Sequence, residues 1–142
     1  MQILLTGDAS KEVEQQLLKL YPTLKADVLL LGHHGSQTSS SLRFLQQLQP
    51  TLVHLHSTKA ALLGRLAARS LGLPVIYTAH GWPFTEGVSA PVAWLYRHLE
   101  LWLSPLVQHF ITVSAYDREL ALTHRIASAS NITVIHNGVP LL

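Results

Sequence analysis

The sequence predicts an α/β protein with a Rossmann-like, doubly wound sheet that is mostly parallel, has about six strands and carries helices on both faces. Short apolar segments alternate with segments of helical periodicity along the chain, which is typical of strands joined by crossover helices. The apolar segments are nearly continuous, and this favours strands that are covered on both sides. No linker or repeat interrupts the pattern, so we expect a single α/β domain over residues 1–142.

The strands are predicted from short β-branched or leucine-rich segments that are bounded by Gly, Pro, Asp or Ser. These segments are Ile3–Leu5, Val28–Leu31, Leu52–Leu55, Val75–Thr78, Phe110–Val113 and Ile132–Ile135. Helices are expected between them, at Ser10–Leu20, Ser40–Gln49, Lys59–Leu71, from Pro91 onward, and from Ser114 to Arg125.

Each helix has its own local signal. Apolar residues recur at helical spacing in the first three, at Val13, Leu17 and Leu20, at Leu42, Leu45 and Leu48, and at Leu63, Leu66 and Ala67. We expect the last three to point inward, Gly64 and Ala68 to permit close approach of the helix, and Gly72 to end it. Pro91 suits a first helical turn, where its missing N–H costs nothing. Ser114 and Asp117 form a capping pattern.

Composition limits the classes of function. The 142 residues are 48% hydrophobic but only 13% charged, which is about half the usual charged share of a soluble domain. We therefore expect exposed apolar surface that contacts a partner, including another copy of the chain. The net charge of +2 and the absence of a basic cluster argue against nucleic-acid binding. Without cysteine, disulfides and thiolate metal sites are excluded.

The longest apolar stretch, Val92 to Val107, is interrupted by charged residues and Pro105, so we do not expect an integral membrane segment. Soluble, cytoplasmic protein is the expectation. The helix from Pro91 to Leu103 carries Trp94 and Trp102, but it has little basic charge for a membrane-surface helix. We therefore expect its apolar side chains to pack in the core.

Polar or ionisable residues follow every predicted strand. They are Asp8, His33-His34, His56-Ser57, His80, Ser114 and His136-Asn137. Because the carboxyl ends of parallel strands lie at one edge, and ligands bind there in open α/β sheets, we predict a polar, histidine-rich edge that faces a ligand. A second interpretation is that some of these residues only cap the following helix, which suits Ser57 and Ser114.

The segments LLTGD and KADVLLLGHHGSQTSSS, within residues 2–50, resemble the C-terminal part of the metallo-β-lactamase-fold domain of ComEC-type competence DNA-uptake proteins. The resemblance implies metal-ligand roles for Asp8 and for His33 or His34. The HxHxDH motif of that fold is absent, so this set is vestigial and incomplete. His54 and His56, at i and i+2, could share one strand face, and weak binding of Zn²⁺ or another divalent metal is expected at most; no cofactor is expected.

From residue 51 to 142, the segments VHLHSTKAALLGRLAARSLGLPVIYTAHGWPFTEG, ITVSAYDRELAL and VIHNGV resemble the N-terminal domain of family 4 glycosyltransferases of the GT-B fold. That domain holds the acceptor side of the cleft. The resemblance implies a catalytic or acceptor-side role for His80. It implies acceptor-binding roles for Ser57, Thr58, Lys59, Gly81, Trp82, Thr85 and Glu86. The helix start at Ser57–Lys59 also suits an anionic ligand.

Three functional hypotheses follow. The first is a glycosyltransferase-like acceptor domain fused to a metallohydrolase-like segment, which binds a sugar or lipid-phosphate acceptor and does not catalyse transfer without a donor-binding domain. The second is a remnant metal-dependent phosphodiester hydrolase of the competence type. The third is a non-catalytic engineered or generated chimera. The first covers the most residues, and its enzymatic label is hexosyl transfer.

Overall fold

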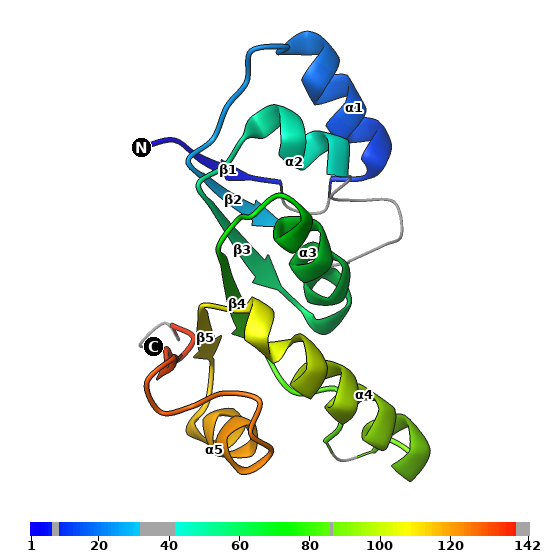
Figure 1. Ribbon diagram of the computed structural model, residues 1–142, viewed down its shortest axis with the longest axis vertical. Coiled ribbons are helices and arrows are strands. Elements are labelled where there is room, and N and C mark those ends of the chain that lie inside the picture. Colours follow the sequence, from blue (N-terminus) through cyan, green and yellow to red (C-terminus); the bar gives the residue numbers. More distant parts are fainter. Residues whose placement is uncertain (7–8, 32–41, 86, 139–142) are drawn as a thin grey trace.

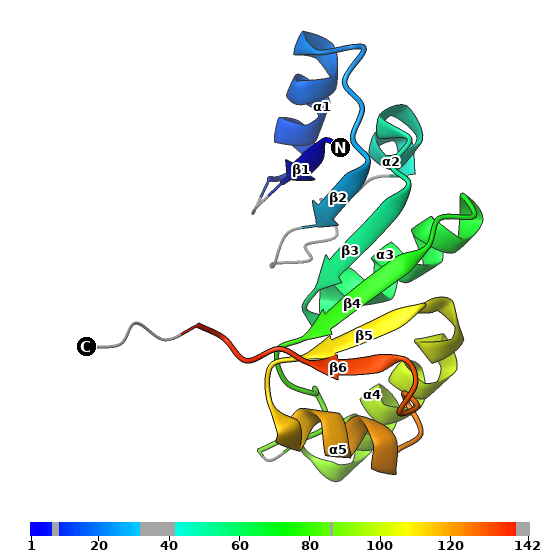
Figure 2. The ribbon, with the colours of Figure 1, turned by 90° about the vertical axis from the view of Figure 1, so that its left-hand side faces the viewer.

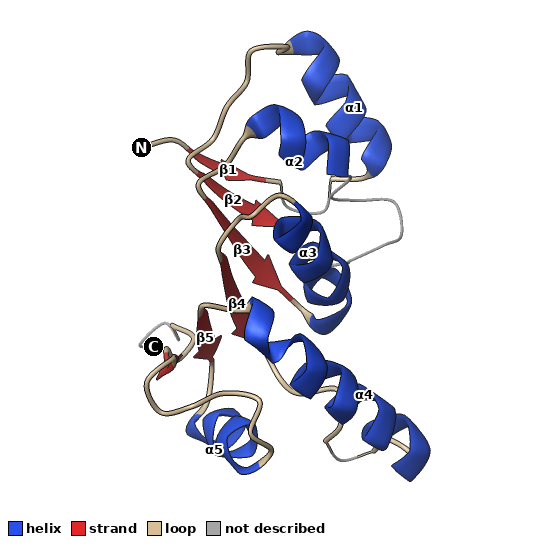
Figure 3. Ribbon diagram, viewed as in Figure 1, coloured by secondary structure: helices blue, strands red, loops and turns tan. Residues whose placement is uncertain are grey.

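A computed structural model of the chain describes residues 1–6, 9–31, 42–85 and 87–138. Its elements, in chain order, are β1 (Ile3–Leu5), α1 (Lys11–Leu20), β2 (Val28–Leu31), α2 (Leu42–Leu48), β3 (Leu52–His56), α3 (Thr58–Ser70), β4 (Val75–Ala79), α4 (Ala90–Leu103), the 3₁₀ turn η1 (Ser104–Leu106), β5 (His109–Thr112), α5 (Ala115–Thr123) and β6 (Ile132–Val134). Every expected strand is present, with ends that differ from the prediction by at most one residue (Figures 1 and 3).

All strands belong to one parallel sheet in the order β1-β2-β3-β4-β5-β6 (Figure 2). The strands β1 and β2 of the competence-like segment therefore continue the same sheet as the rest. The strand β2 pairs with β3 in a register that places Leu29 beside Val53 and Leu31 beside Leu55. The predicted Rossmann-like α/β fold is confirmed.

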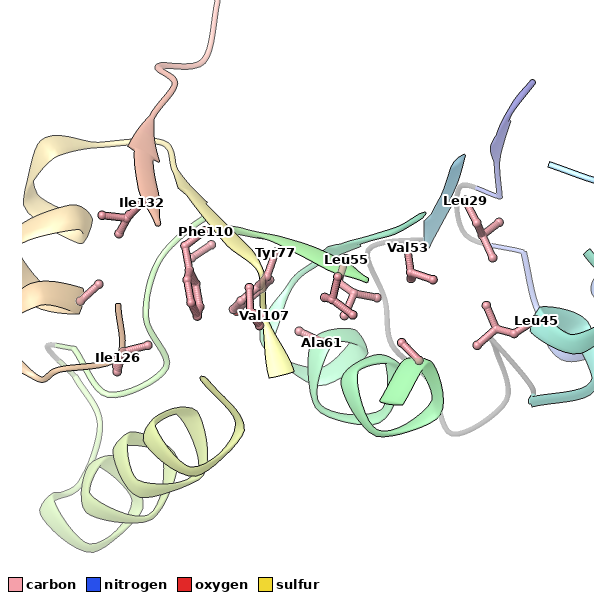
Figure 4. Packing of buried hydrophobic residues seen from close by; sticks show 14 of the residues in the cluster. Leu29, Leu45, Val53, Leu55, Ala61, Tyr77, Val107, Phe110, Ile126 and Ile132 are labelled. Carbon is pink, nitrogen blue, oxygen red and sulfur yellow. The ribbon is translucent and has the colours of Figure 1, made fainter. Parts of the chain in front are cut away.

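The coverage of the sheet differs from the expected doubly wound arrangement. Right-handed crossovers between strands in sequential order place their helices on the same side. Figures 1 and 4 show the helices along one face of the sheet. The nearly continuous apolar strand segments favoured coverage of both faces. The side on which each crossover helix lies is set by the order of the strands, which those segments do not contain.

We call the covered side the helix face. Its central row runs across the sheet through directly paired residues, and all of them are buried: Leu55, Tyr77, Phe110 and Ile132. The core cluster joins this row to side chains of the helices and loops, including Ala61 and Ile126 (Figure 4). The rings of Tyr77 and Phe110 meet edge to face with centroids 6.1 Å apart. One continuous core therefore lies between the sheet and its helices.

We call the opposite side the histidine face. It consists of the alternate residues Leu30, His54, His56, Ile76, Thr78, His109, Ile111 and Thr133. Most of these side chains are half-buried, so burial alternates along β3 and β5. At the β1 edge, Ile3 and Leu5 are 55% and 65% exposed.

The inward residues of α3 differ from the predicted ones. Ala61, Gly64, Arg65 and Ala68 are buried, whereas Leu63 and Leu66 are about half exposed. The small residues let the helix approach β3 closely: a Cβ on Gly64 would come within 2.5 Å of the Leu55 side chain. The close approach expected at Gly64 is confirmed, whereas the inward position expected for Leu63 and Leu66 was wrong because that close approach selects small residues at the contact.

The helix α4 also turns differently from the prediction. Glu100 and Leu103 are buried, whereas Trp94, Leu95 and Trp102 are 56%, 50% and 71% exposed. The inward orientation is fixed by Glu100, whose Oε2 accepts a hydrogen bond from Arg65 Nη1 at 2.9 Å. The expected core packing of the tryptophans is therefore wrong. No helix among the described residues has the length and apolar character needed to cross a membrane.

Candidate functional site at the carboxyl edge of the sheet

Two histidines from adjacent strands meet at the carboxyl edge. His56 is the last residue of β3, and His80 directly follows the last residue of β4. His56 Nδ1 and His80 Nε2 are 2.9 Å apart, which is hydrogen-bond distance. His80 is exposed and His56 is half-buried. The predicted histidine-rich edge therefore brings these two rings together.

A third imidazole lies beside this pair on the histidine face. The ring centroids of His54 and His56 are 4.5 Å apart, and His54 Nε2 lies 2.8 Å from Thr78 Oγ1. Burial, and then the neighbouring charge of His80, hold the pKa of His54 below its ordinary value of 6.5. His54 is therefore neutral at pH 7 and is held in place by Thr78.

The connection from β3 to α3 is strained. Ser57 has φ 64° and ψ 149°, a backbone conformation that glycine adopts almost alone. Its side chain makes no capping hydrogen bond, and its Oγ is buried without a hydrogen-bond partner among the described residues. Ser57 therefore does not cap α3, in contrast to our second interpretation of this residue. Strained residues of this kind cluster at functional sites.

The loop after β4 is anchored in the core. Trp82 is 2% exposed, and its Nε1 donates a hydrogen bond to the Asp117 carbonyl oxygen at 2.8 Å. Its ring stacks on Phe84 with centroids 5.8 Å apart. Thr85 Oγ1 donates to the Trp82 carbonyl oxygen at 2.9 Å. Trp82 thus ties the loop to α5, while Gly81, with φ 150°, stays exposed between it and His80.

The connection from β5 to α5 contrasts with the one after β3. Ser114 Oγ accepts a hydrogen bond from the Asp117 backbone N–H at 3.0 Å, and donates one to Asp117 Oδ2 at 2.5 Å. The predicted cap at Ser114 is confirmed. Farther along this edge, His136 Nδ1 lies 3.1 Å from the Val113 carbonyl oxygen. This end of the edge is occupied by structural hydrogen bonds.

Several predicted site residues cannot be placed. The predicted metal ligands Asp8, His33 and His34, and the predicted acceptor residue Glu86, lie outside the described residues, as does the side chain of Lys59. Thr58 is the first residue of α3 and is half-buried beside Ser57. Within the described part of the chain, no three or more histidine or acidic side chains converge so as to hold a metal ion.

A buried charged cluster was not predicted from the sequence. Arg65 and Glu100 are each 1% exposed, and the Arg65 guanidinium lies 5.1 Å from the centre of the Tyr77 ring. Burial is the main cause that raises the pKa of Glu100, against the opposing effect of Arg65. Burial also raises the pKa of Tyr77, so its phenol stays protonated. The available signal was a lone carboxylate within a mostly apolar helix, together with an arginine among the small residues of another helix.

Comparison with known proteins connects this edge to a family. The family model described as Glycosyltransferase Family 4 matches residues 5–141. The Escherichia coli protein UDP-Gal:alpha-D-GlcNAc-diphosphoundecaprenol alpha-1,3-galactosyltransferase is 32% identical over 121 residues, which are 84% of this chain and 31% of that protein.

Two further relatives match a shorter stretch. ComE operon protein 3 of Bacillus subtilis is 54% identical over 50 residues, 35% of this chain and 6% of that protein. Recombination protein 2 of Haemophilus influenzae is 44% identical over 55 residues, 39% of this chain and 7% of that protein. The chain thus spans less than a third of the galactosyltransferase and a small fraction of the other two.

The match to the transferase family is not confined to the part of the chain after residue 50. It begins at residue 5, so it also includes α1, β2 and α2, which precede β3. This agrees with a sheet in which β1 and β2 continue the order of the remaining strands. Because the match covers nearly all of its residues, the chain belongs to glycosyltransferase family 4.

Proposed function

We propose that this chain supplies the acceptor side of a family 4 glycosyltransferase and binds a sugar acceptor linked to a lipid phosphate. The observation that carries the proposal is the pairing of His56 with the exposed His80 at the carboxyl edge, beside the strained Ser57. Ligands of open parallel sheets bind at this edge. The similarity to an enzyme whose name specifies a GlcNAc-diphosphoundecaprenol acceptor supports this choice of ligand.

In this proposal, the roles of the edge residues follow from their chemistry. His80 contacts the acceptor hydroxyl and receives its proton during transfer, because an imidazole is suited to general base catalysis near neutral pH. The amino-terminal end of α3, at Thr58 and Lys59, binds the phosphates, since free backbone N–H groups and a lysine attract anions. Gly81, Thr85 and Glu86 border the sugar, and Trp82 holds their loop in place through Asp117.

Binding of a water-soluble, short-chain GlcNAc-diphosphoprenol can be measured by isothermal titration calorimetry. We expect His80→Ala to weaken binding by at least about tenfold, because it removes a hydrogen bond worth about 1.5 kcal/mol or more to a charged or polarised partner. His98→Ala is the matched control, because His98 is exposed on α4 and contacts Trp94. Equal affinities of the wild type and His80→Ala would refute the assignment of His80.

Transfer itself is a separate expectation. We propose that the chain does not transfer hexose without a donor-binding domain, because the donor phosphates must be positioned and their charge stabilised for the reaction. The test adds the remaining part of the E. coli galactosyltransferase to the chain and follows UDP release from UDP-galactose. Turnover that requires both components, and is lost in His80→Ala, is the expected result. Turnover by the chain alone would contradict this part of the proposal.

A second function is favoured by one observation, the 54% identity to ComE operon protein 3 over 50 residues. It is metal-dependent phosphodiester hydrolysis through Asp8 and His33 or His34. Hydrolysis of bis(p-nitrophenyl) phosphate in the presence of Zn²⁺ or Mn²⁺, lost in Asp8→Ala, would support it. If neither the acceptor nor the phosphodiester is bound or converted, the result would support the third hypothesis, a non-catalytic engineered or generated chimera.

A further inference from the structure

The outer side of α4 presents a mostly apolar surface to solvent. The structure describes the whole of α4, and its two charged side chains are withdrawn from this side: Glu100 is buried and Arg97 is half-buried. Exposed residues recur instead at helical spacing along α4 and the adjoining η1, and we call them the α4 stripe: Pro91, Trp94, Leu95, His98, Leu101, Trp102 and Pro105. A surface helix usually carries charged and polar residues on this side. The stripe therefore indicates a surface that a partner covers.

The order of residues in the α4 stripe is symmetric about His98. Identical residues stand at equal distances before and after it, in the pairs Trp94 and Trp102, Leu95 and Leu101, and Pro91 and Pro105. In a two-fold contact, a residue i that meets residue j of the other copy is accompanied by j meeting i. Two α4 helices packed antiparallel, with the two-fold axis at His98, therefore bring the tryptophan-leucine pair before His98 in each copy against the leucine-tryptophan pair after it in the other. The stripe is thus complementary to itself.

We propose that the α4 stripe is the interface of a symmetric homodimer, in which two copies of this chain pack their α4 helices antiparallel. The exposed area fits such a contact. The tryptophans and leucines of the stripe, with the exposed parts of Val92 and of Leu66 on α3, offer roughly 700 Å² per copy, close to the ~800 Å² that each partner buries in a stable interface. A lipid surface or an unrelated protein requires apolar residues but no symmetry in their order. The matched pairs therefore favour a second copy.

A groove beside the stripe extends this surface toward α3. Its volume is about 280 Å³, and its lining residues are Leu66, Arg69, Trp102, Leu103, Pro105 and Leu106. Most of these side chains are apolar, and Arg69 adds a charged group of the kind found at the rim of protein interfaces. The groove thus gives the second copy a concave contact next to the stripe.

The centre of the stripe is ordered within the single chain. The imidazole of His98 donates its Nδ1–H to the Trp94 carbonyl oxygen at 2.7 Å, and the centroids of the two side-chain rings are 4.1 Å apart. The buried hydrogen bond between Arg65 and Glu100 fixes the rotation of α4 and so keeps the stripe toward solvent. Groups that are already held in place lose less conformational entropy on association. The stripe is therefore preorganised for a second copy.

The interface can be tested by analytical ultracentrifugation of the full chain. We expect a monomer–dimer equilibrium that shifts with protein concentration. Trp94→Glu and Leu101→Lys should each raise the dissociation constant of the dimer by at least about a hundredfold, because each change occurs twice in the symmetric contact and places a charge at its centre. Tyr116→Glu on α5 and Leu20→Lys on α1 are the matched controls, since both positions are exposed and lie outside the stripe. They should leave the dissociation constant unchanged.

Mixing the two variants tests the antiparallel orientation. In a mixed dimer, the new carboxylate of Trp94→Glu faces the new ammonium group of Leu101→Lys, while the second contact keeps both native residues. The mixture should therefore associate at least about tenfold more tightly than either variant alone. Parallel helices would place each position against itself and gain no such pair.

Circular dichroism verifies the fold of each variant, and all four substituted positions are exposed. A chain that stays monomeric at every concentration would overturn the proposal, as would a mixture no tighter than its components or dissociation caused by a control variant. Cosedimentation of a monomeric chain with phosphatidylglycerol vesicles, lost in Trp94→Glu, would also overturn it and would identify the stripe as a lipid-binding surface.

Discussion

The two faces of the sheet differ in how their side chains are held: by apolar packing on one face and by hydrogen bonds on the other. On the helix face, buried apolar rows such as Leu55, Tyr77 and Phe110 pack against α3 and α5. On the histidine face, polar side chains satisfy one another across neighbouring strands. The three hydrogen bonds His54–Thr78, His56–His80 and His109–Thr133 each join residues that are 24 positions apart in the sequence. One face therefore provides stability, and the other presents reactive groups.

This difference explains where we expect substitutions to be costly. A buried apolar side chain or a buried charge cannot be replaced without leaving a cavity or an unpaired group. A half-buried hydrogen bond between strands can be replaced by contacts with water, and its net contribution is about 1 kcal/mol. The same kind of substitution should thus have unequal effects on the two faces, and the following variants test that inequality.

Loss of one partner of the buried ion pair should have the largest effect. Glu100→Ala leaves the Arg65 guanidinium, which is 1% exposed, without its carboxylate. We expect the free energy of unfolding to fall by about 3–5 kcal/mol, as measured by urea denaturation. Replacement of both by apolar residues, Arg65→Met with Glu100→Leu, should cost less than either single change, because no unpaired charge remains.

The matched control is on the histidine face. His109 Nε2 lies 2.9 Å from Thr133 Oγ1 at a half-buried position, so His109→Ala should cost no more than about 1 kcal/mol. A cost equal to that of Glu100→Ala would show that the histidine face contributes to stability as the helix face does. It would then contradict the contrast between the two faces.

Two leucines of β3 test apolar packing with identical chemistry. Leu55 is fully buried on the helix face against Gly64, whereas Leu52 is half-buried on the other side of the strand. Leu55→Ala should lower the free energy of unfolding by about 3–5 kcal/mol, and Leu52→Ala by about 1 kcal/mol. Thermal and urea unfolding of both variants provide the measurement. Similar losses would mean that the second face is also part of a packed core.

The pH dependence of stability should carry the signature of Glu100. Its pKa is raised by burial above the usual 4.5, so the folded state holds this proton more tightly than the unfolded state. The stability that protonated Glu100 contributes is complete below pH 4.5 and is lost as the pH rises through the folded pKa. Over that range the free energy of unfolding falls by at most about 1.4 kcal/mol per pH unit. Glu100→Gln, which cannot ionise, should remove that slope from urea unfolding measured between pH 4 and 8. An unchanged slope would contradict this cause.

Much of the fold could be predicted, because strand positions depend on local composition. The order of the strands and the inward side of the helices depend on tertiary contacts that periodicity does not contain. In α3, close approach at Gly64 was predicted, but not that this approach buries Arg65 and leaves Leu63 and Leu66 half exposed. In α4, the helix buries Glu100 and leaves Trp94 and Trp102 exposed, although apolar character alone predicts the opposite orientation.

The candidate site was predictable to a similar extent. That His56 and His80 share one edge follows from the parallel topology, and both were predicted to lie there. Their contact does not follow, because it depends on the register that pairs His56 with Thr78. The strain at Ser57 was also out of reach, since serine before a helix is usually a cap and its positive φ leaves no trace in the sequence.

The smallest expected effects come from the two serines that precede α3 and α5. Ser114 caps α5 through the Asp117 N–H, so Ser114→Ala should lower the free energy of unfolding by about 1 kcal/mol. Ser57 makes no capping bond, so Ser57→Ala should cost less than Ser114→Ala, and Ser57→Gly should stabilise the protein by about 0.5–1 kcal/mol because glycine tolerates φ 64°. Urea unfolding measures the loss of stability expected for Ser114→Ala and the gain expected for Ser57→Gly. If Ser57→Gly raised stability and weakened acceptor binding in calorimetry, the strain would belong to the site; if it destabilised the protein, Ser57 would have a structural role like that of Ser114.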